Sequence, residues 1–138
     1  MIIVLDTNIL LVSLAKTSKY RPIFDALLGE RFRLAVSNEI LSEYVEILSQ
    51  KTTQTIAHNV AELLINLPNV VKTEVYFRWG LITQDFDDNK FADCAIAANA
   101  DFLVTNDRHF RELKDVEFPQ LAVISAADFL AKVNNLLI

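Results

Sequence analysis

The sequence predicts an α/β fold in which helices cover both faces of a mostly parallel central sheet of four to five strands. Short apolar runs with the composition of strands alternate along the chain with longer amphipathic segments. The first run, residues 1–5, is continuously apolar and stops at a polar turn, which is typical of a parallel strand buried on both faces. The chain shows no internal repeat, low-complexity tract or linker, so we expect one domain over residues 1–138.

Each expected element is bounded by residues that favour its ends. Strands are expected at residues 1–5, 32–36, 70–77, 101–105 and 121–124, and helices at residues 9–16, 20–28, 37–49, 53–67, 89–99, 107–113 and 125–134. Pro22 suits the first turn of the second helix, and Gly29 ends it. Ser37 is the expected N-cap of the third helix, and Pro68 ends the fourth. Residues 70–77 fit either one strand or a strand followed by a connection.

The composition predicts a soluble, cytoplasmic globular protein. Hydrophobic residues make up 52% of the chain and charged residues 22%, a balance that excludes disorder as the default. No apolar run reaches the roughly 18 to 20 residues of a membrane span, and the apolar start meets Asp6 too soon for a signal peptide. The single cysteine, Cys94, excludes an internal disulfide, and His58 and His109 are too far apart in the sequence to suggest a zinc-type cluster.

The net charge of −5 argues against tight nonspecific binding to nucleic acid by charge alone. It does not exclude a nucleic-acid enzyme whose own acids are neutralised by a divalent metal ion. Two local groups of basic residues consist of Lys16, Lys19 and Arg21, and of Arg108, His109, Arg111 and Lys114. Taken alone, either group is also compatible with an ordinary solvated face.

One acid, Asp93, lies in an unusually apolar helical segment. It is the only charged residue between Phe91 and Ala100. A carboxylate in such surroundings is costly unless a partner stabilises its charge. The sequence offers no local Arg or Lys on that face of the helix. The partner is therefore expected to be either a bound cation or a hydrogen-bond network from elsewhere in the chain.

Four acids are expected to converge at one edge of the sheet. Asp6 and Asp107 each follow an apolar strand closely, and the carboxyl ends of parallel strands form the crevice where such sheets bind ligands. Glu43, on the inner border of its helix, and Asp93 can reach the same crevice. Four carboxylates repel one another unless a cation joins them, and ligand sets of oxygen alone favour Mg²⁺ or Mn²⁺ over zinc. One or two such ions can activate water for attack on a phosphodiester.

Four sequence blocks resemble the PIN-domain family, close to its bacterial subfamily of toxins from toxin–antitoxin pairs. The blocks are IIVLDTNIL, SNEILSEYVEIL, DFDDNKFADCAIAANADFLVTND and VISAADFL. They cover nearly the whole chain in the family's order and spacing. The resemblance implies a three-layer α/β/α sandwich, a Mg²⁺- or Mn²⁺-dependent endoribonuclease that hydrolyses RNA, a small antitoxin protein as partner, and a homodimer formed through residues 9–28 and 53–67.

The resemblance also implies roles for individual residues. It assigns catalysis and metal binding to Asp6, Glu43, Asp93 and Asp107. It assigns the orientation of these acids or of a metal-bound water to Asn8, Ser37, Asp88, Thr105 and Asn106. Substrate binding is a weaker expectation for Lys90, Arg108 and Arg111. The family usually has Pro at Phe86 and often Gly at Ala98 or Asn106, differences that affect loop shape and substrate fit.

Other interpretations of these residues stay open at this point. Asp6, Asp88 and Asp107 can each cap the helix that follows, and Glu43 can be an ordinary solvated acid. The chain can also be a catalytically silent PIN-like binding module that acts through protein or RNA partners. A phosphotransfer receiver is disfavoured because no lysine follows a strand in the required context. With only two glycines, the chain has no Gly-rich phosphate loop.

Overall fold

The computed structural model describes residues 1–136 and contains a five-stranded sheet in which all neighbouring strands are parallel. The strands are β1 (Ile2–Leu5), β2 (Arg33–Val36), β3 (Val70–Lys72), β4 (Phe102–Val104) and β5 (Val123–Ile124), in the spatial order β3-β2-β1-β4-β5. The first strand of the chain is therefore the central strand, and its carboxyl end lies between those of β2 and β4. The predicted α/β fold with a central parallel sheet is confirmed.

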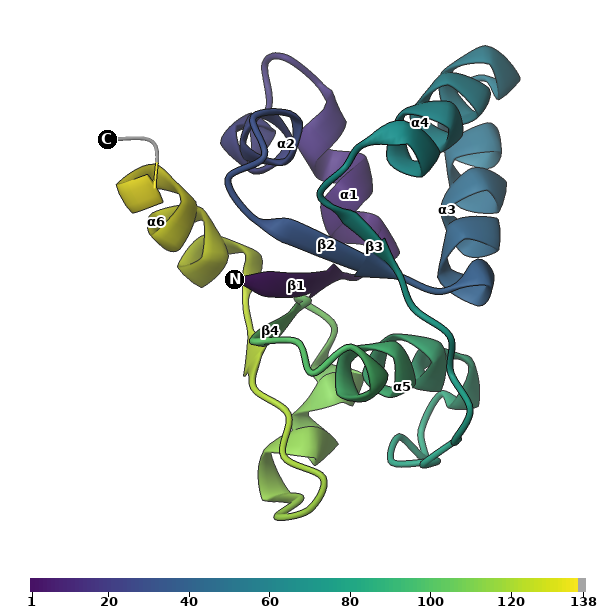
Figure 1. The fold of residues 1–138 in the computed structure, drawn as a ribbon, viewed down its shortest axis with the longest axis vertical. Coiled ribbons are helices and arrows are strands. Elements are labelled where there is room, and N and C mark those ends of the chain that lie inside the picture. Colours follow the sequence, from purple (N-terminus) through teal and green to yellow (C-terminus); the bar gives the residue numbers. More distant parts are fainter. Residues whose placement is uncertain (137–138) are drawn as a thin grey trace.

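Helices cover both faces of this sheet (Figure 1). They are α1 (Thr7–Leu14), α2 (Arg21–Leu28), α3 (Asn38–Lys51), α4 (Gln54–Asn66), α5 (Asn89–Ala97) and α6 (Ala126–Leu136), with the 3₁₀ helices η1 (Phe86–Asp88) and η2 (Arg108–Asp115). Helices α1, α2 and α4 lie on one side, where α6 packs against α2, and α5 lies on the other side against β1, β2 and β4 (Figure 1). Helix α3 contacts both α1 and α5. Within residues 1–136, no helix combines the length and the apolar composition needed to cross a membrane.

Side-chain caps explain where the two long helices begin. Ser37 Oγ accepts a hydrogen bond from the Ile40 N–H at 3.2 Å, and Thr53 Oγ1 accepts one from the Ile56 N–H at 3.1 Å. Each hydroxyl satisfies a backbone donor that the first turn of a helix leaves without an intrahelical partner. The predicted N-cap at Ser37 is confirmed, and it fixes the direction in which α3 leaves the carboxyl end of β2.

Two expected elements are resolved by the structure. Of the two alternatives for residues 70–77, the structure has a strand followed by a connection, since β3 ends at Lys72. The N–H of Thr73 still donates to Val36 O at 2.8 Å, but β2 ends at Val36, so the chain beyond has no strand to pair with. The helix expected at residues 107–113 is the 3₁₀ helix η2, and Asp107 Oδ1 caps it by accepting the His109 N–H at 2.9 Å. Because a 3₁₀ helix has three residues per turn, its side chains form three straight rows.

Buried contacts fix the helices on the sheet. The Tyr44 hydroxyl of α3 donates to Leu5 O at 2.6 Å, and Tyr44 itself is buried. This hydrogen bond joins α3 to the end of the central strand, next to Asp6. A second contact involves α6: its Phe129 ring packs edge-on against Phe32, the residue before β2, with ring centroids 5.3 Å apart. The two contacts hold α3 and α6 in place around β1.

We expect Phe129→Ala to lower the free energy of unfolding by about 3 to 5 kcal/mol, because it opens a cavity among buried side chains. Urea denaturation at neutral pH measures the change. The matched control is Phe86→Ala, since the Phe86 ring is 74% exposed, and its effect should stay within about 0.5 kcal/mol. Equal effects of the two substitutions would contradict the packing of α6 against the sheet.

Candidate functional site

Two adjacent strand ends bring Asp6 and Asp107 to one place. β1 and β4 are neighbours, and the Asp6 N–H donates to Val104 O at 3.0 Å. Thr105 Oγ1 donates to Asp6 Oδ2 at 2.7 Å and accepts the Asp107 N–H at 3.0 Å. One buried hydroxyl therefore contacts both acidic residues at the carboxyl edge of the sheet. These contacts agree with the predicted role of Thr105 in orienting the acids.

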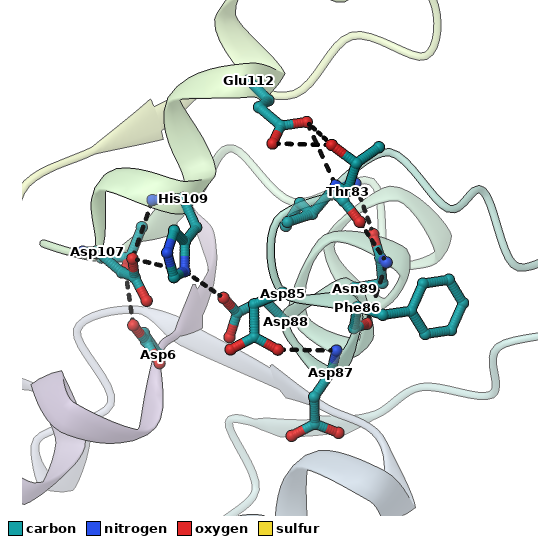
Figure 2. A network of polar contacts seen from close by, with 12 residues as sticks. Asp6, Thr83, Asp85, Phe86, Asp87, Asp88, Asn89, Asp107, His109 and Glu112 are labelled. Carbon is teal, nitrogen blue, oxygen red and sulfur yellow. Dashed lines mark hydrogen bonds and ion pairs between the residues drawn. The ribbon is translucent and has the colours of Figure 1, made fainter.

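Asp88 and His109 approach the same place from α5 and η2. His109 Nδ1 lies 3.4 Å from Asp88 Oδ2 and 3.3 Å from Asp107 Oδ1, as Figure 2 shows. Asp88 occupies the N-cap position of α5, but its side chain makes no capping hydrogen bond within the described chain. The capping interpretation of Asp88 is therefore wrong, and its carboxylate faces the other acids instead.

The acids of this group are electrostatically strained. Burial raises the pKa of Asp88 to about 6, and repulsion from Asp85, Asp107 and Asp6 adds to the effect. Burial also raises the pKa of Asp6 above its ordinary value, with Asp107 and Glu43 as further causes, while the hydrogen bond from Thr105 opposes the rise. Carboxylates that disfavour their own charge in this way are stabilised when a cation binds between them.

The donor atoms of the group fit such a cation. Asp88 Oδ2 and His109 Nδ1 are buried, and apart from their mutual approach at 3.4 Å and that of His109 Nδ1 to Asp107 at 3.3 Å, neither has a polar partner among the described residues. Buried polar atoms without partners are rare, and a bound ion is one of the few arrangements that satisfies them. Asp85, Asp88 and His109 each offer a ligand atom, and these atoms lie within 4.8 Å of one another. The group formed by Asp6, Asp85, Asp88, Asp107 and His109 is called the acidic site below.

Glu43 lies beside the acidic site, but a lysine compensates its charge. The Glu43 carboxylate accepts a hydrogen bond from the Thr7 hydroxyl, and Glu43 Oε1 lies 2.9 Å from Lys90 Nζ. Lys90 also lies 3.1 Å from Asp87. Burial lowers the pKa of Lys90, but its contacts with Glu43 and Asp87 outweigh burial and raise it, so the ammonium stays charged. Glu43 therefore needs a metal ion less than Asp6 or Asp88 does.

Asp93 faces a different set of residues. Its Oδ1 accepts the Trp79 N–H at 3.0 Å, and it lines a small cavity with Arg78 and Glu39. Burial raises the pKa of Asp93, whereas the Trp79 N–H and the Arg78 guanidinium lower it. Asp88 and Asp93 are five positions apart, which at about 100° per residue separates their directions by about 140°. Of the two partners that the sequence left open, the structure provides the hydrogen-bond network from elsewhere in the chain.

The remaining predicted residues have separate surroundings. Ser37 caps α3, and Asn106 Oδ1 accepts the Ala126 N–H at the start of α6 at 3.0 Å. Exposed Asn8 lines a cavity of about 290 Å³ together with Asp6 and Asp107. Arg108 and Arg111 line a second cavity, of about 210 Å³, that also borders Asp107. Of these, Asn8, Asn106, Arg108 and Arg111 adjoin the acidic site.

His109 and Asp85 belong to the acidic site although the sequence indicated no ligand role for them. In the sequence, His109 is notable only as a member of a basic group and as a histidine too far from His58 for a zinc-type cluster. The sequence signal for His109 is its position two residues after Asp107, an acid at a strand end. The direction of the His109 side chain, however, depends on the 3₁₀ geometry of η2. Asp85 is exposed and lies at the solvent side of the site.

Acids from separate segments at the carboxyl edge of a parallel sheet define an α/β protein with a site suited to a divalent cation. Residues 2–109 match the family model described as PIN domain, so the chain belongs to the PIN-domain family. The resemblance found in the sequence is thereby confirmed. The comparison of the sequence with curated proteins gives no match.

Solved structures share this fold. VapBC2 from Rickettsia felis, bound to a DNA fragment from its promoter, has a chain with a TM-score of 0.62 and 23% identity that covers 91% of this chain and 98% of its own. A chain of DNA-bound VapBC from Salmonella typhimurium has a TM-score of 0.62 and 18% identity, and the match covers 91% of this chain and 98% of its own. A chain of VapBC-1 from nontypeable Haemophilus influenzae has a TM-score of 0.60 and 20% identity, and the match covers 92% of this chain and 99% of its own. At these identities the likeness shows the fold alone.

The raised pKa of Asp88 predicts how stability depends on pH in metal-free protein. The folded state holds the Asp88 proton more tightly than the unfolded state, whose value is 3.8, so stability is lost as pH rises from 3.8 to about 6. Asp88→Asn should remove this loss, which we expect to be on the order of 1 kcal/mol after allowance for solvent screening. Urea denaturation in EDTA below and above this range measures it.

Exposed Asp115 provides the control for that experiment, because Asp115→Asn removes the same charge at the far end of η2. Its pH dependence should equal that of the wild type. An Asp88→Asn variant with an unaltered pH dependence would contradict the electrostatic strain assigned to the acidic site.

Proposed function

We propose that this PIN-domain protein is a metal-dependent endoribonuclease that hydrolyses RNA phosphodiester bonds. The meeting of Asp6, Asp88 and Asp107 at one edge of the sheet carries the proposal. Burial, with repulsion from neighbouring acids as a smaller cause, raises the pKa of Asp6 and Asp88, and such acids are costly in a purely structural protein. The cost is understandable if the group binds a cation during its activity. Family membership supports nuclease chemistry at this edge of the fold.

Asp6, Asp88 and Asp107 would hold the ion together with Asp85 and His109, whose ligand atoms lie within 4.8 Å of that of Asp88. Asp88 thus takes the position that the sequence assigned to Asp93, because its carboxylate faces the other acids. Mainly oxygen ligands favour Mg²⁺ or Mn²⁺, and the nearby imidazole is better tolerated by Mn²⁺. When bound, one or two such ions would activate a water molecule and neutralise charge on the leaving oxygen.

The chain's own residues would prepare the site for this chemistry. The Thr105 hydroxyl fixes the Asp6 carboxylate, and Asp107 is fixed by capping η2. The His109 imidazole, within 3.4 Å of Asp88 and Asp107, lies between these two carboxylates and is placed to contact an ion bound there. Lys90 holds Glu43 at the border of the site, where this pair can contact the substrate strand.

We further propose that the protein is the toxin of a toxin–antitoxin pair and is restrained by a small antitoxin. The sequence resemblance to that subfamily supports this role, as does the shared fold with chains of VapBC complexes and of FitAB bound to DNA. An antitoxin could insert a cationic side chain into the acidic site in place of the metal ion. A homodimer stays a prediction, and exposed Val12, Ile56 and Ile65 on α1 and α4 are compatible with an interface there.

The activity test compares acids that face the site with one that does not. Asp6→Asn, Asp88→Asn and Asp107→Asn should each lower RNA cleavage by at least about 100-fold, since each removes charge that would bind the metal ion. Asp93→Asn should lose less than about tenfold, because an asparagine oxygen can still accept the Trp79 N–H. Cleavage of a labelled RNA in Mn²⁺ and in EDTA gives the rates.

Asp115→Asn is the control for charge and should cleave RNA like the wild type. Equal losses of cleavage rate in Asp93→Asn and Asp6→Asn would indicate that Asp93 is a metal ligand, as the sequence predicted. Metal-independent cleavage, or no cleavage by the wild type with either ion, would reject the proposed chemistry and favour the catalytically silent binding module.

A further inference from the structure

The sequence of η2, RHFRELKD, has a period of three that matches its 3₁₀ geometry. Side chains three positions apart are eclipsed in such a helix, so η2 has three distinct rows. Phe110 and Leu113 form the buried row. His109 and Glu112 form a second row: His109 belongs to the acidic site, and Glu112 accepts hydrogen bonds from Thr83, as Figure 2 shows.

The third row consists of Arg108, Arg111 and Lys114, and we call it the basic row. All three residues are exposed and line the same cavity of about 210 Å³. With a rise of about 2.0 Å per residue, neighbouring members of the row start about 6 Å apart along the helix axis. The row is therefore a linear array of cations on a rigid element and not a scatter of surface charges.

Three other cations of this protein have acidic partners, whereas the basic row has none in the described chain. Among residues 1–136, exposed Lys16, Arg31 and Lys51 also have none, so the row is distinguished by the alignment of its three cations beside Asp107. Arg21 pairs with Asp25, Arg78 with Glu39, and Lys90 with Glu43 and Asp87. Between residues 1 and 136, no carboxylate lies within 4.0 Å of a charged nitrogen of Arg108, Arg111 or Lys114. In a chain of net charge −5, three adjacent cations without acidic partners indicate a place where an external anion binds.

The position of the row indicates which anion. Asn106 and Asp107 border the same cavity, as does Ser125 at the start of α6. The row thus begins directly next to the acid that follows β4 and extends away from it. A strand whose scissile phosphate lies at the acidic site can place its adjoining phosphates along this row. Guanidinium groups match phosphate oxygens in geometry as well as charge.

We propose that Arg108, Arg111 and Lys114 form a phosphate track that binds the backbone of single-stranded RNA beside its cleavage point. The inference rests on the proposed ribonuclease function and specifies how that site holds its substrate. A track of this kind contacts phosphates and not base edges, so it provides affinity without sequence specificity. It also compensates locally for the negative charge that would otherwise repel RNA from the acidic site.

The test measures binding in EDTA, where no cleavage occurs, with a short fluorescent single-stranded RNA as the probe. A triple variant Arg108→Gln, Arg111→Gln, Lys114→Gln is compared with the wild type by anisotropy between about 50 and 200 mM salt. Each lost phosphate contact should reduce the slope of log affinity against log salt by about 0.7, hence by about 2 for the triple variant. At the lowest salt its affinity should be at least about tenfold weaker.

The control variant is Lys16→Gln, Arg31→Gln, Lys51→Gln, which removes the same charge from exposed positions outside the row. It should keep the wild-type salt slope, and thermal melts of both variants should match the wild type because all six side chains are exposed. Equal affinities and slopes for the two triple variants would overturn the phosphate track.

Cleavage assays separate this outcome from failure of the proposed function. If the wild type cleaves RNA with Mn²⁺ while the basic-row variant binds RNA like the control, the track is wrong and the nuclease stands. If the basic-row variant alone loses RNA affinity, the track is supported, and in Mn²⁺ its KM for RNA should rise by a similar factor. A wild type that binds RNA through the row but never cleaves it would contradict the nuclease and leave the track as a binding surface.

Discussion

Repulsion among carboxylates at the carboxyl edge of the sheet is the constraint on which this structure depends. Backbone pairing of β1 with β4 brings Asp6 and Asp107 together, and the start of α5 adds Asp88. The Asp6 carboxylate is held there by Thr105, and the Asp107 carboxylate by the His109 N–H. Burial is the larger cause of the raised pKa of Asp6 and Asp88, and repulsion from neighbouring acids adds to it. A divalent cation would convert the repulsion into attraction, so the same geometry that destabilises the metal-free protein would provide its binding site.

The protein neutralises its other inward acids by different means, and the contrast identifies the site. Glu43 has Lys90, and Asp93 has the Trp79 N–H with Arg78 nearby. Such acids are satisfied within the chain itself. Asp88 Oδ2 instead makes no hydrogen bond that meets ordinary geometry in the described part of the protein, and its one polar neighbour there is His109 Nδ1, 3.4 Å away. A binding site for an ion is expected where the chain leaves acids unsatisfied, and the distribution of partners therefore favours the group around Asp88 over the Asp93 cavity.

The sequence was sufficient for the fold and for part of the site. Apolar runs and helix caps predict the parallel sheet, and strand-end positions predict that Asp6 and Asp107 meet, because both properties depend on local patterns. The direction of Asp93 depends on the path of residues 73–85, which have no regular structure and no local pattern that fixes their course. His109 joins the site only because η2 is a 3₁₀ helix. Irregular segments and helix type were thus the limits of the prediction, since tertiary contacts determine both.

A crystal structure of the protein soaked with Mn²⁺ tests the central claim most directly, because anomalous scattering locates the ion independently of any activity. The account predicts an anomalous peak between the carboxylates of Asp6, Asp88 and Asp107, with ligand distances of about 2.0 to 2.2 Å, similar to those of other small divalent ions. A peak beside Asp93 and Glu39, or none at the acidic site when the ion is in excess, would contradict it.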